Sequence, residues 1–231
     1  MIEVENRSQA ATTPSVRLRR KIDLVIQPFA AACRTLVADP RLVELWPAYL
    51  ITQHAIIRAT VPLTEAAATR AAAMAPADPV APGLTRYLEE HVEEERGHDD
   101  SLLDDLELLG VDRATVLGRI PSPSVASLVG CQYYWIHHHH PIALLGFIAL
   151  MEGHPPTRKL IETLISATGY PRAAFHTFDE HSELDPGHRD RLDRTIDSLP
   201  LTREHETILG ISAMYSATLL PRTVEDILEQ A

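Results

Sequence analysis

The chain has 231 residues, enough for one domain with a full hydrophobic core, and no Gly/Ser-rich or Pro-rich linker divides it. Lysine and arginine number 21 against 32 aspartates and glutamates, which gives a formal net charge of −11. This charge disfavours binding to phosphate backbones and anionic lipid, so we expect neither nucleic acid nor a membrane as a partner.

The two cysteines, Cys33 and Cys131, lie far apart and lack a CxxC spacing, which argues against a disulfide framework or a thiolate zinc site. The N-terminal sequence lacks the basic and apolar regions of a signal peptide, and no apolar run approaches the length of a membrane span. We therefore expect a soluble protein of the reducing cytoplasm.

No alternating period-two pattern of useful length appears, so the sequence predicts an all-α protein. We expect residues 1–15 to form a flexible polar tail and residues 16–231 to form a single helical domain. A first helix is expected from about residue 16 to residue 36, and a second from about residue 41 to residue 74 with a bend at Pro62.

The second predicted helix carries His54 and Glu65, which are eleven residues apart and therefore share one face. Together they are candidates for a substrate contact or an extra metal ligand. His54 is equally well explained as a core histidine that bonds to a carbonyl group. Arg58 is a candidate for binding a substrate carboxylate, or is simply a surface arginine.

A third helix is expected after the connector at residues 75–83 and should end at Leu109-Gly110. Its apolar residues recur with a 3-4-3-4 spacing in a stripe along one face of the helix. Three polar residues share this face and should therefore point inward. The stripe consists of Leu84, Leu88, His91, Glu95, His98, Leu102 and Leu106. Glu93, Glu94 and Arg96 should then face outward.

Glu95 is the unusual member of this stripe. Burying an unpaired carboxylate is costly, so an acid in an apolar stripe needs a cation, a proton or a hydrogen-bond network beside it. The spacing Glu95-x2-His98 is also that of the ligand pairs in carboxylate-bridged diiron bundles. A solvated charged face explains the neighbouring glutamates but not Glu95.

A short helix is expected at residues 113–120, followed by a largely apolar helical segment that Pro141 interrupts. The segment contains the run His137–His140, of which at most one or two members can face inward, because consecutive residues spread around a helix axis. Glu152 is the only acid in the stretch from Pro141. It either faces the bundle interior or turns toward water at a helix end before Gly153.

After a helix to about residue 167, another helix should open near Tyr170-Pro171 and carry the run His181-x3-Asp185-x2-His188 on one stripe. Two imidazoles and a carboxylate suit iron, manganese or zinc better than calcium or magnesium. Because the chain has 12 histidines, a chance cluster is the competing explanation.

Proline 186 leaves the shape of this run open. Either one kinked helix holds all three side chains together, or Asp185 caps a new helix that begins at Pro186 and carries His188 on a separate axis. The last helices are expected from about residue 202 to residue 220 and from residue 223 to the end.

Together these residues resemble the heme-oxygenase-like diiron oxidases and oxygenases, often labelled iron-containing redox enzymes. The phrases Gly130-Cys-Gln-Tyr-Tyr and Pro141-Ile-Ala-Leu-Leu-Gly-Phe also look like this family's fourth-helix region, so the resemblance spans roughly residues 40–220. It implies an all-α, seven-helix heme-oxygenase-like bundle. The iron ligands that it implies are His98, Glu152, His181, Asp185 and His188.

The sequence departs from this family at one ligand position. Family members often have a glutamate seven residues before the third-helix histidine, where this chain has His91. Glu95 is the nearest inward acid, so His91 and Glu95 both remain candidates for completing the iron site.

By this resemblance, two Fe(II) ions would bind O2 as cosubstrate and oxidise a small metabolite, such as an amine, an amino acid or a fatty acid, in a biosynthetic pathway. An external electron donor and a homodimeric partner would be compatible with that activity. A metal-free enzyme like the thiaminases and pyrroloquinoline-quinone synthases of the same fold is one alternative, and it would need a catalytic cysteine or a cofactor-like pocket.

A non-enzymatic helical protein with a structural metal site is a second alternative. A heme-binding protein is a third, but it would leave the carboxylates Glu95, Glu152 and Asp185 unexplained.

Overall fold

Helices make up most of the chain in this computed structural model, which describes residues 12–75 and 77–230. No β-strand occurs in these residues, as predicted. The helices are α1 (Pro14–Val25), α2 (Gln27–Ala38), α3 (Leu42–Ile57), α4 (Thr60–Met74), α5 (Ala81–Glu95), α6 (His98–Leu108), α7 (Arg113–Gly118), α8 (Pro123–His138), α9 (Ala143–Met151), α10 (Arg158–Thr168), the 3₁₀ turn η1 (Arg172–Phe175), α11 (His176–Ser198) and α12 (Arg203–Gln230).

The N-terminal tail predicted for residues 1–15 lies largely outside the described residues, and α1 begins at Pro14. Side-chain caps fix several helix starts, because Thr13, Asp112, Ser122 and Thr157 each accept a hydrogen bond from a backbone N–H of the first turn.

Several helices that were predicted to be continuous are divided, which accounts for more helices than the seven expected. The first predicted helix is split into α1 and α2, and the second is split into α3 and α4 at Arg58 and Ala59. The predicted bend at Pro62 is therefore misplaced. Pro62 lies in the first turn of α4, where the missing N–H would have no helical partner in any case.

The third predicted helix is also interrupted, between α5 and α6. Gly97 has a φ of 95°, in the left-handed region that favours glycine, and it turns the chain between Glu95 and His98. The prediction of one straight helix through this segment was wrong.

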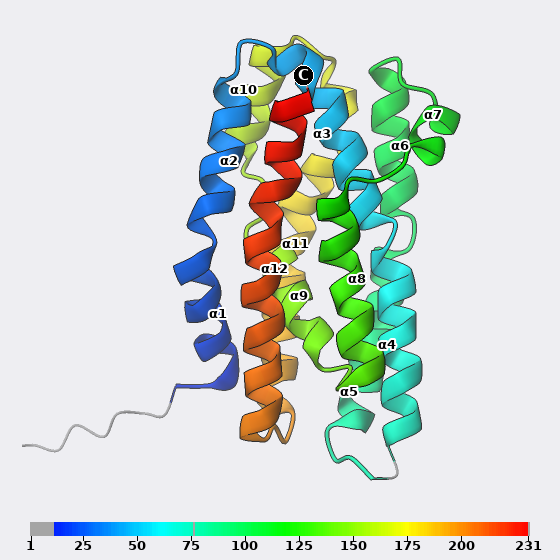
Figure 1. Cartoon of the computed structure of the whole chain (residues 1–231), viewed down its shortest axis with the longest axis vertical. Helices are drawn as coiled ribbons and strands as arrows, with labels where there is room; N and C mark the ends of the chain where they lie inside the picture. The colour runs from blue at the N-terminus through cyan, green and yellow to red at the C-terminus, as the bar shows by residue number, and fades with distance from the viewer. Residues whose placement is uncertain (1–11, 76, 231) are drawn as a thin grey trace, which may run out of the picture.

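Two prolines do not interrupt their helices. Helix α11 continues through Pro186, so His181, Asp185 and His188 share one helix, and α12 continues through Pro221. The prediction of two separate C-terminal helices was wrong. Helix α12 spans most of the length of the bundle and packs along α1, α2, α8 and α9, so tertiary packing keeps it in one piece (Figure 1).

Helix α9 is short and almost wholly apolar, and residues 143–150 are all buried. It packs closely against α12 because position 146 is glycine, where a Cβ would overlap the carbonyl oxygen of Leu209. This central position of α9 places Glu152, the residue after the helix, inside the protein.

The apolar core consists of two clusters of buried side chains. One surrounds α9 and α12, and the other surrounds Trp46, which stacks on Phe175. Among the described residues, no helix is both long enough and apolar enough to cross a membrane.

Candidate metal centre

The seven predicted ligands lie around one interior space, although they come from four parts of the chain. Helix α5 supplies His91 and Glu95, α6 supplies His98, the residue after α9 is Glu152, and α11 supplies His181, Asp185 and His188. Exposed fractions are 1% for His91, 8% for Glu95, 8% for Glu152 and 5% for Asp185. The acids are therefore buried, and Glu152 does not turn toward water.

One half of the cluster gathers around Glu152. Its Oε1 atom lies 3.6 Å from Nε2 of His91 and 3.9 Å from Nδ1 of His188. His91, Glu95 and Glu152 each contribute one possible ligand atom, and these three atoms lie within 4.8 Å of one another. The three side chains can therefore reach a common ion.

The other half gathers around His98 and His181, whose ring centroids are 5.0 Å apart. Nδ1 of His98 lies 3.4 Å from Oε2 of Glu95, and Nδ1 of His181 lies 2.9 Å from Oδ1 of Asp185. Glu95 thus lies between the two halves, within reach of both.

The donor atoms of the cluster fit a transition metal. Within the described part of the chain, several of them are buried and lack any hydrogen-bond partner: Nδ1 of His98 and His188, Nε2 of His181 and both carboxylate oxygens of Glu152. Such orphaned polar atoms are rare in proteins unless something binds them.

The spacing of these atoms is also suitable. Iron and zinc hold nitrogen and oxygen ligands at about 2.1 Å, so two ligands of one ion lie about 3 to 4 Å apart, depending on the bond angle. The separations in the cluster that join a histidine to Glu95 or Glu152 are 3.4, 3.6 and 3.9 Å.

The carboxylates differ in their electrostatic surroundings. Burial raises the pKa of Glu152 well above its ordinary value, the negative charges of Glu95 and Asp185 raise it further, and Arg19 opposes them. Burial also acts to raise the pKa of Glu95, but the adjacent histidines, His98 first among them, outweigh it and lower the pKa. Without a metal, Glu95 is the readily ionised acid of the pair.

Glu94 is a functional candidate that the sequence did not indicate. It was predicted to face outward with Glu93, but its side chain is only 28% exposed, against 71% for Glu93. Its Oε2 lies 3.7 Å from Nδ1 of His91 and 3.9 Å from Nε2 of His188, and both of its oxygens contact Arg191. Only the fold could reveal this, because α11 brings Arg191 to α5 from far along the chain.

A mostly apolar cavity of about 200 Å³ adjoins the cluster. Its lining includes His91, Glu95, Glu152, His181 and Asp185 of the cluster. Apolar lining residues include Phe29, Ile56, Phe147, Ile148, Phe178 and Leu220, and Gln53 is a polar lining residue outside the cluster. Of the described residues, no arginine or lysine lines this cavity.

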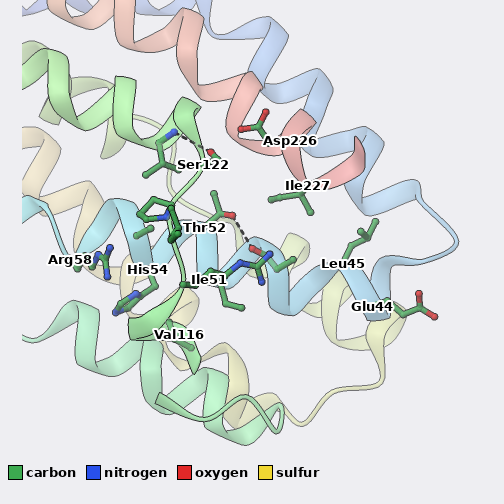
Figure 2. A pocket seen from close by; sticks show the side chains of 16 residues that line it. Glu44, Leu45, Ile51, Thr52, His54, Arg58, Val116, Ser122, Asp226 and Ile227 are labelled. Carbon is green, nitrogen blue, oxygen red and sulfur yellow. Dashed lines mark hydrogen bonds between the residues drawn. The ribbon is translucent and has the colours of Figure 1, made fainter. Parts of the chain in front are cut away.

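His54 belongs to a different cavity, which Figure 2 shows on the other face of α3. This second cavity shares no lining residue with the first, and Arg58 lines it next to His54. Nε2 of His54 is buried without a partner in the described structure. The predicted common face of His54 and Glu65 was wrong, because the helix breaks between them and Glu65 is exposed on α4.

The histidine run after α8 follows its prediction, since His140 is buried and the three histidines before it are exposed. Nε2 of His140 lies 2.7 Å from Oδ2 of Asp78, and His205 lies close enough to these two residues to form a second His/Asp group. However, Nδ1 of His140 accepts the N–H of Ile142, so Nε2 carries the ring proton and donates it to Asp78. This group is therefore satisfied by hydrogen bonds rather than by a metal.

Comparison with known proteins identifies the family. The sequence matches the family described as "Iron-containing redox enzyme" over residues 53–218, more than half of the chain. The protein therefore belongs to this family, as the resemblance of its motifs predicted. No functionally curated protein matches the sequence significantly.

Solved structures share the fold. A domain of unknown function with a heme oxygenase-like fold from Shewanella denitrificans OS217 has a TM-score of 0.79 and 17% identity, covering 93% of this chain and 92% of that chain. A CADD-like protein of unknown function from Nostoc punctiforme PCC 73102 has a TM-score of 0.64 and 18% identity, covering 93% and 96%. A TenA homolog from Pseudomonas syringae pv. tomato strain DC3000 has a TM-score of 0.64 and 12% identity, covering 90% and 92%. The predicted heme-oxygenase-like fold is thus confirmed.

Proposed function

We propose that this member of the iron-containing redox enzyme family is a nonheme diiron oxidase or oxygenase that acts on a small, largely apolar metabolite. The observation that carries the proposal is the convergence of four histidines and three carboxylates on one interior space, with several of their donor atoms buried and unpartnered.

The cluster has enough donors for two ions. His91, His188 and Glu152 would hold one iron, and His98, His181 and Asp185 would hold the other. Glu95 would be shared, since it lies between the two groups, and the proposal therefore includes both His91 and Glu95. Bound iron would supply the binding and reductive activation of O2.

The residues around the cluster favour an apolar substrate. The cavity wall excludes water through its aromatic and aliphatic side chains, and Gln53 can orient a polar group by hydrogen bonding. Because no arginine or lysine among the described residues lines the cavity, a free amino acid would find no permanently charged partner for its carboxylate. We therefore propose an amine or a hydrocarbon chain as the substrate class.

An external electron donor is part of the proposal. Reduction of O2 to water consumes more electrons than a desaturated or hydroxylated substrate supplies, so another molecule must provide the rest. The acidic surface implied by the net charge of −11 favours a donor with a basic docking surface.

The thiol-dependent form of the metal-free alternative needs a reactive cysteine, and neither cysteine is suited to this role. Burial raises the pKa of Cys33 and of Cys131 to about 11, so little thiolate forms near neutral pH. Slow reaction of both thiols with a thiol reagent at pH 7 is expected. Rapid, stoichiometric labelling of either cysteine would instead favour the thiol-dependent enzyme.

Anaerobic loading with Fe(II), followed by elemental analysis and oxygen uptake, tests the proposed function. We expect about two irons per chain and O2 consumption that depends on them. A single, exchange-resistant zinc without oxygen uptake would support the structural metal site instead.

A further inference from the structure

We propose that Glu94, held in place by Arg191, is a positioning residue that orients the rings of His91 and His188 for metal binding. This inference rests on the proposed function, because it takes the interior cluster to be a metal centre. It assigns a role to a carboxylate that the ligand set itself does not use.

Both rings lie between two carboxylates. His91 turns Nε2 toward Glu152 at 3.6 Å and Nδ1 toward Glu94 at 3.7 Å. His188 turns Nδ1 toward the same oxygen of Glu152 at 3.9 Å and Nε2 toward the same oxygen of Glu94 at 3.9 Å. The two imidazoles are nearly perpendicular, with an interplanar angle of 86°. Each ring therefore has one nitrogen facing each acid.

The two acids have different surroundings, which decides where the metal goes. Glu152 is 8% exposed, and neither of its oxygens has a hydrogen-bond partner among the described groups. Glu94 is already paired, because both of its oxygens contact the guanidinium of Arg191. The metal side is therefore the side of Glu152, and Glu94 lies behind the rings.

Arg191 is itself held in place. Its guanidinium lies over the ring of Tyr87 at 5.6 Å from the centroid, and that ring stacks on His91 with a centroid distance of 5.6 Å. The ring of Tyr87 thus lies in contact both with Arg191 and with His91, one of the two rings that Glu94 would orient.

The chemistry of histidine ligands gives Glu94 its role. A neutral imidazole that binds a metal through one nitrogen carries its proton on the other, and that N–H usually donates to a carboxylate or carbonyl oxygen. Glu94 offers one acceptor to both rings. Because an N–H···O bond measures about 3.0 Å, the groups need to approach by less than about 1 Å. His91 should then bind through Nε2 and His188 through Nδ1.

Metal affinity provides the first test. Fe(II) dissociation constants would be measured anaerobically by competition with a chromophoric chelator, for the wild type, Glu94→Ala, Glu94→Gln and the control Glu93→Gln. Loss of such an outer partner typically weakens metal binding about 10- to 100-fold. We expect this loss in Glu94→Ala, a smaller loss in Glu94→Gln, which keeps the shape and one acceptor oxygen, and wild-type affinity in Glu93→Gln. Both Glu94 variants should still bind two ions at saturation.

Nitrogen-15 NMR of the zinc-loaded protein gives a readout that a merely structural role would not move. We expect the ring protons on Nδ1 of His91 and Nε2 of His188, and faster exchange of both protons in Glu94→Gln. Wild-type affinity and unchanged exchange in the variants would overturn the inference alone. Loss of one of the two bound ions would overturn it too, since Glu94 would then be a ligand. A wild type that binds no metal would overturn the proposed function itself.

Discussion

Replacing Glu152 by glutamine should stabilise the metal-free protein and strongly reduce its stabilisation by iron. The carboxyl group is buried and unpartnered, and its pKa lies well above the ordinary value of 4.5, first because of burial and then because of Glu95 and Asp185. The folded protein therefore keeps a proton that the unfolded chain releases. Its stability must fall as the pH rises from 4.5 toward the raised pKa.

The size of this effect follows from linkage. Each pH unit between 4.5 and the raised pKa costs up to about 1.4 kcal/mol of stability. Glutamine cannot ionise, so the stability of Glu152→Gln relative to the wild type should rise by up to about this amount per pH unit. For a protein of this size, 1 kcal/mol corresponds to about 2–4 °C in Tm.

Denaturant unfolding in the presence of a chelator, at pH 4.5 and at pH 6, measures this difference. The control is Glu89→Gln, a glutamate exposed on α5, which should show no such pH-dependent gain. Adding Fe(II) at about 100 times its Kd should stabilise the wild type by about 2.7 kcal/mol and the Glu152 variant much less. A variant with the same difference from wild type at both pH values, or with a full response to iron, would refute this reasoning.

Three further predictions concern the cluster and the packing around it. Glu95→Ala should lower the iron content measured by elemental analysis, while Glu93→Ala, at an exposed position two residues earlier, should not. Equal losses of iron would mean that the inward face of α5 is wrongly assigned. Gly146→Ala should lower the free energy of unfolding in denaturant by about 1–3 kcal/mol, because the added Cβ meets the backbone of α12. Gly130→Ala, which has open space around its Cβ, should leave this free energy unchanged or raise it by up to about 1 kcal/mol. An unchanged stability of Gly146→Ala would contradict the close packing of α9 and α12. Hydrogen exchange should show Fe(II)-dependent protection mainly in residues 175–195, where Pro186 lacks the N–H of one helical hydrogen bond. Uniform protection without metal would indicate a preformed site.

The clustering of the predicted side chains could be anticipated from the sequence because the signal is local. Donor types and helical spacing are both visible in the sequence, and the apolar stripe through His91, Glu95 and His98 fixed which side of the helix faces inward. The break at Gly97 did not change which residues face inward, because Glu95 and His98 still face each other across the left-handed glycine.

Features that depend on distant packing were not predictable. Glu94 lies at the edge of the inward face, and its burial depends on Arg191 and His188, which α11 brings against it. Proline 186 was expected to kink or divide its helix, yet neighbouring helices keep α11 continuous. Local propensity could not show either outcome, because the deciding contacts are far apart in the sequence.

The most direct test of the diiron assignment is an anaerobic Fe(II) titration followed by exposure to O2, with the visible absorption spectrum recorded during mixing. We expect binding to saturate at about two irons per chain and O2 to be consumed with a transient visible band. Saturation at a single ion, with no oxygen consumed and no spectral change, would contradict it.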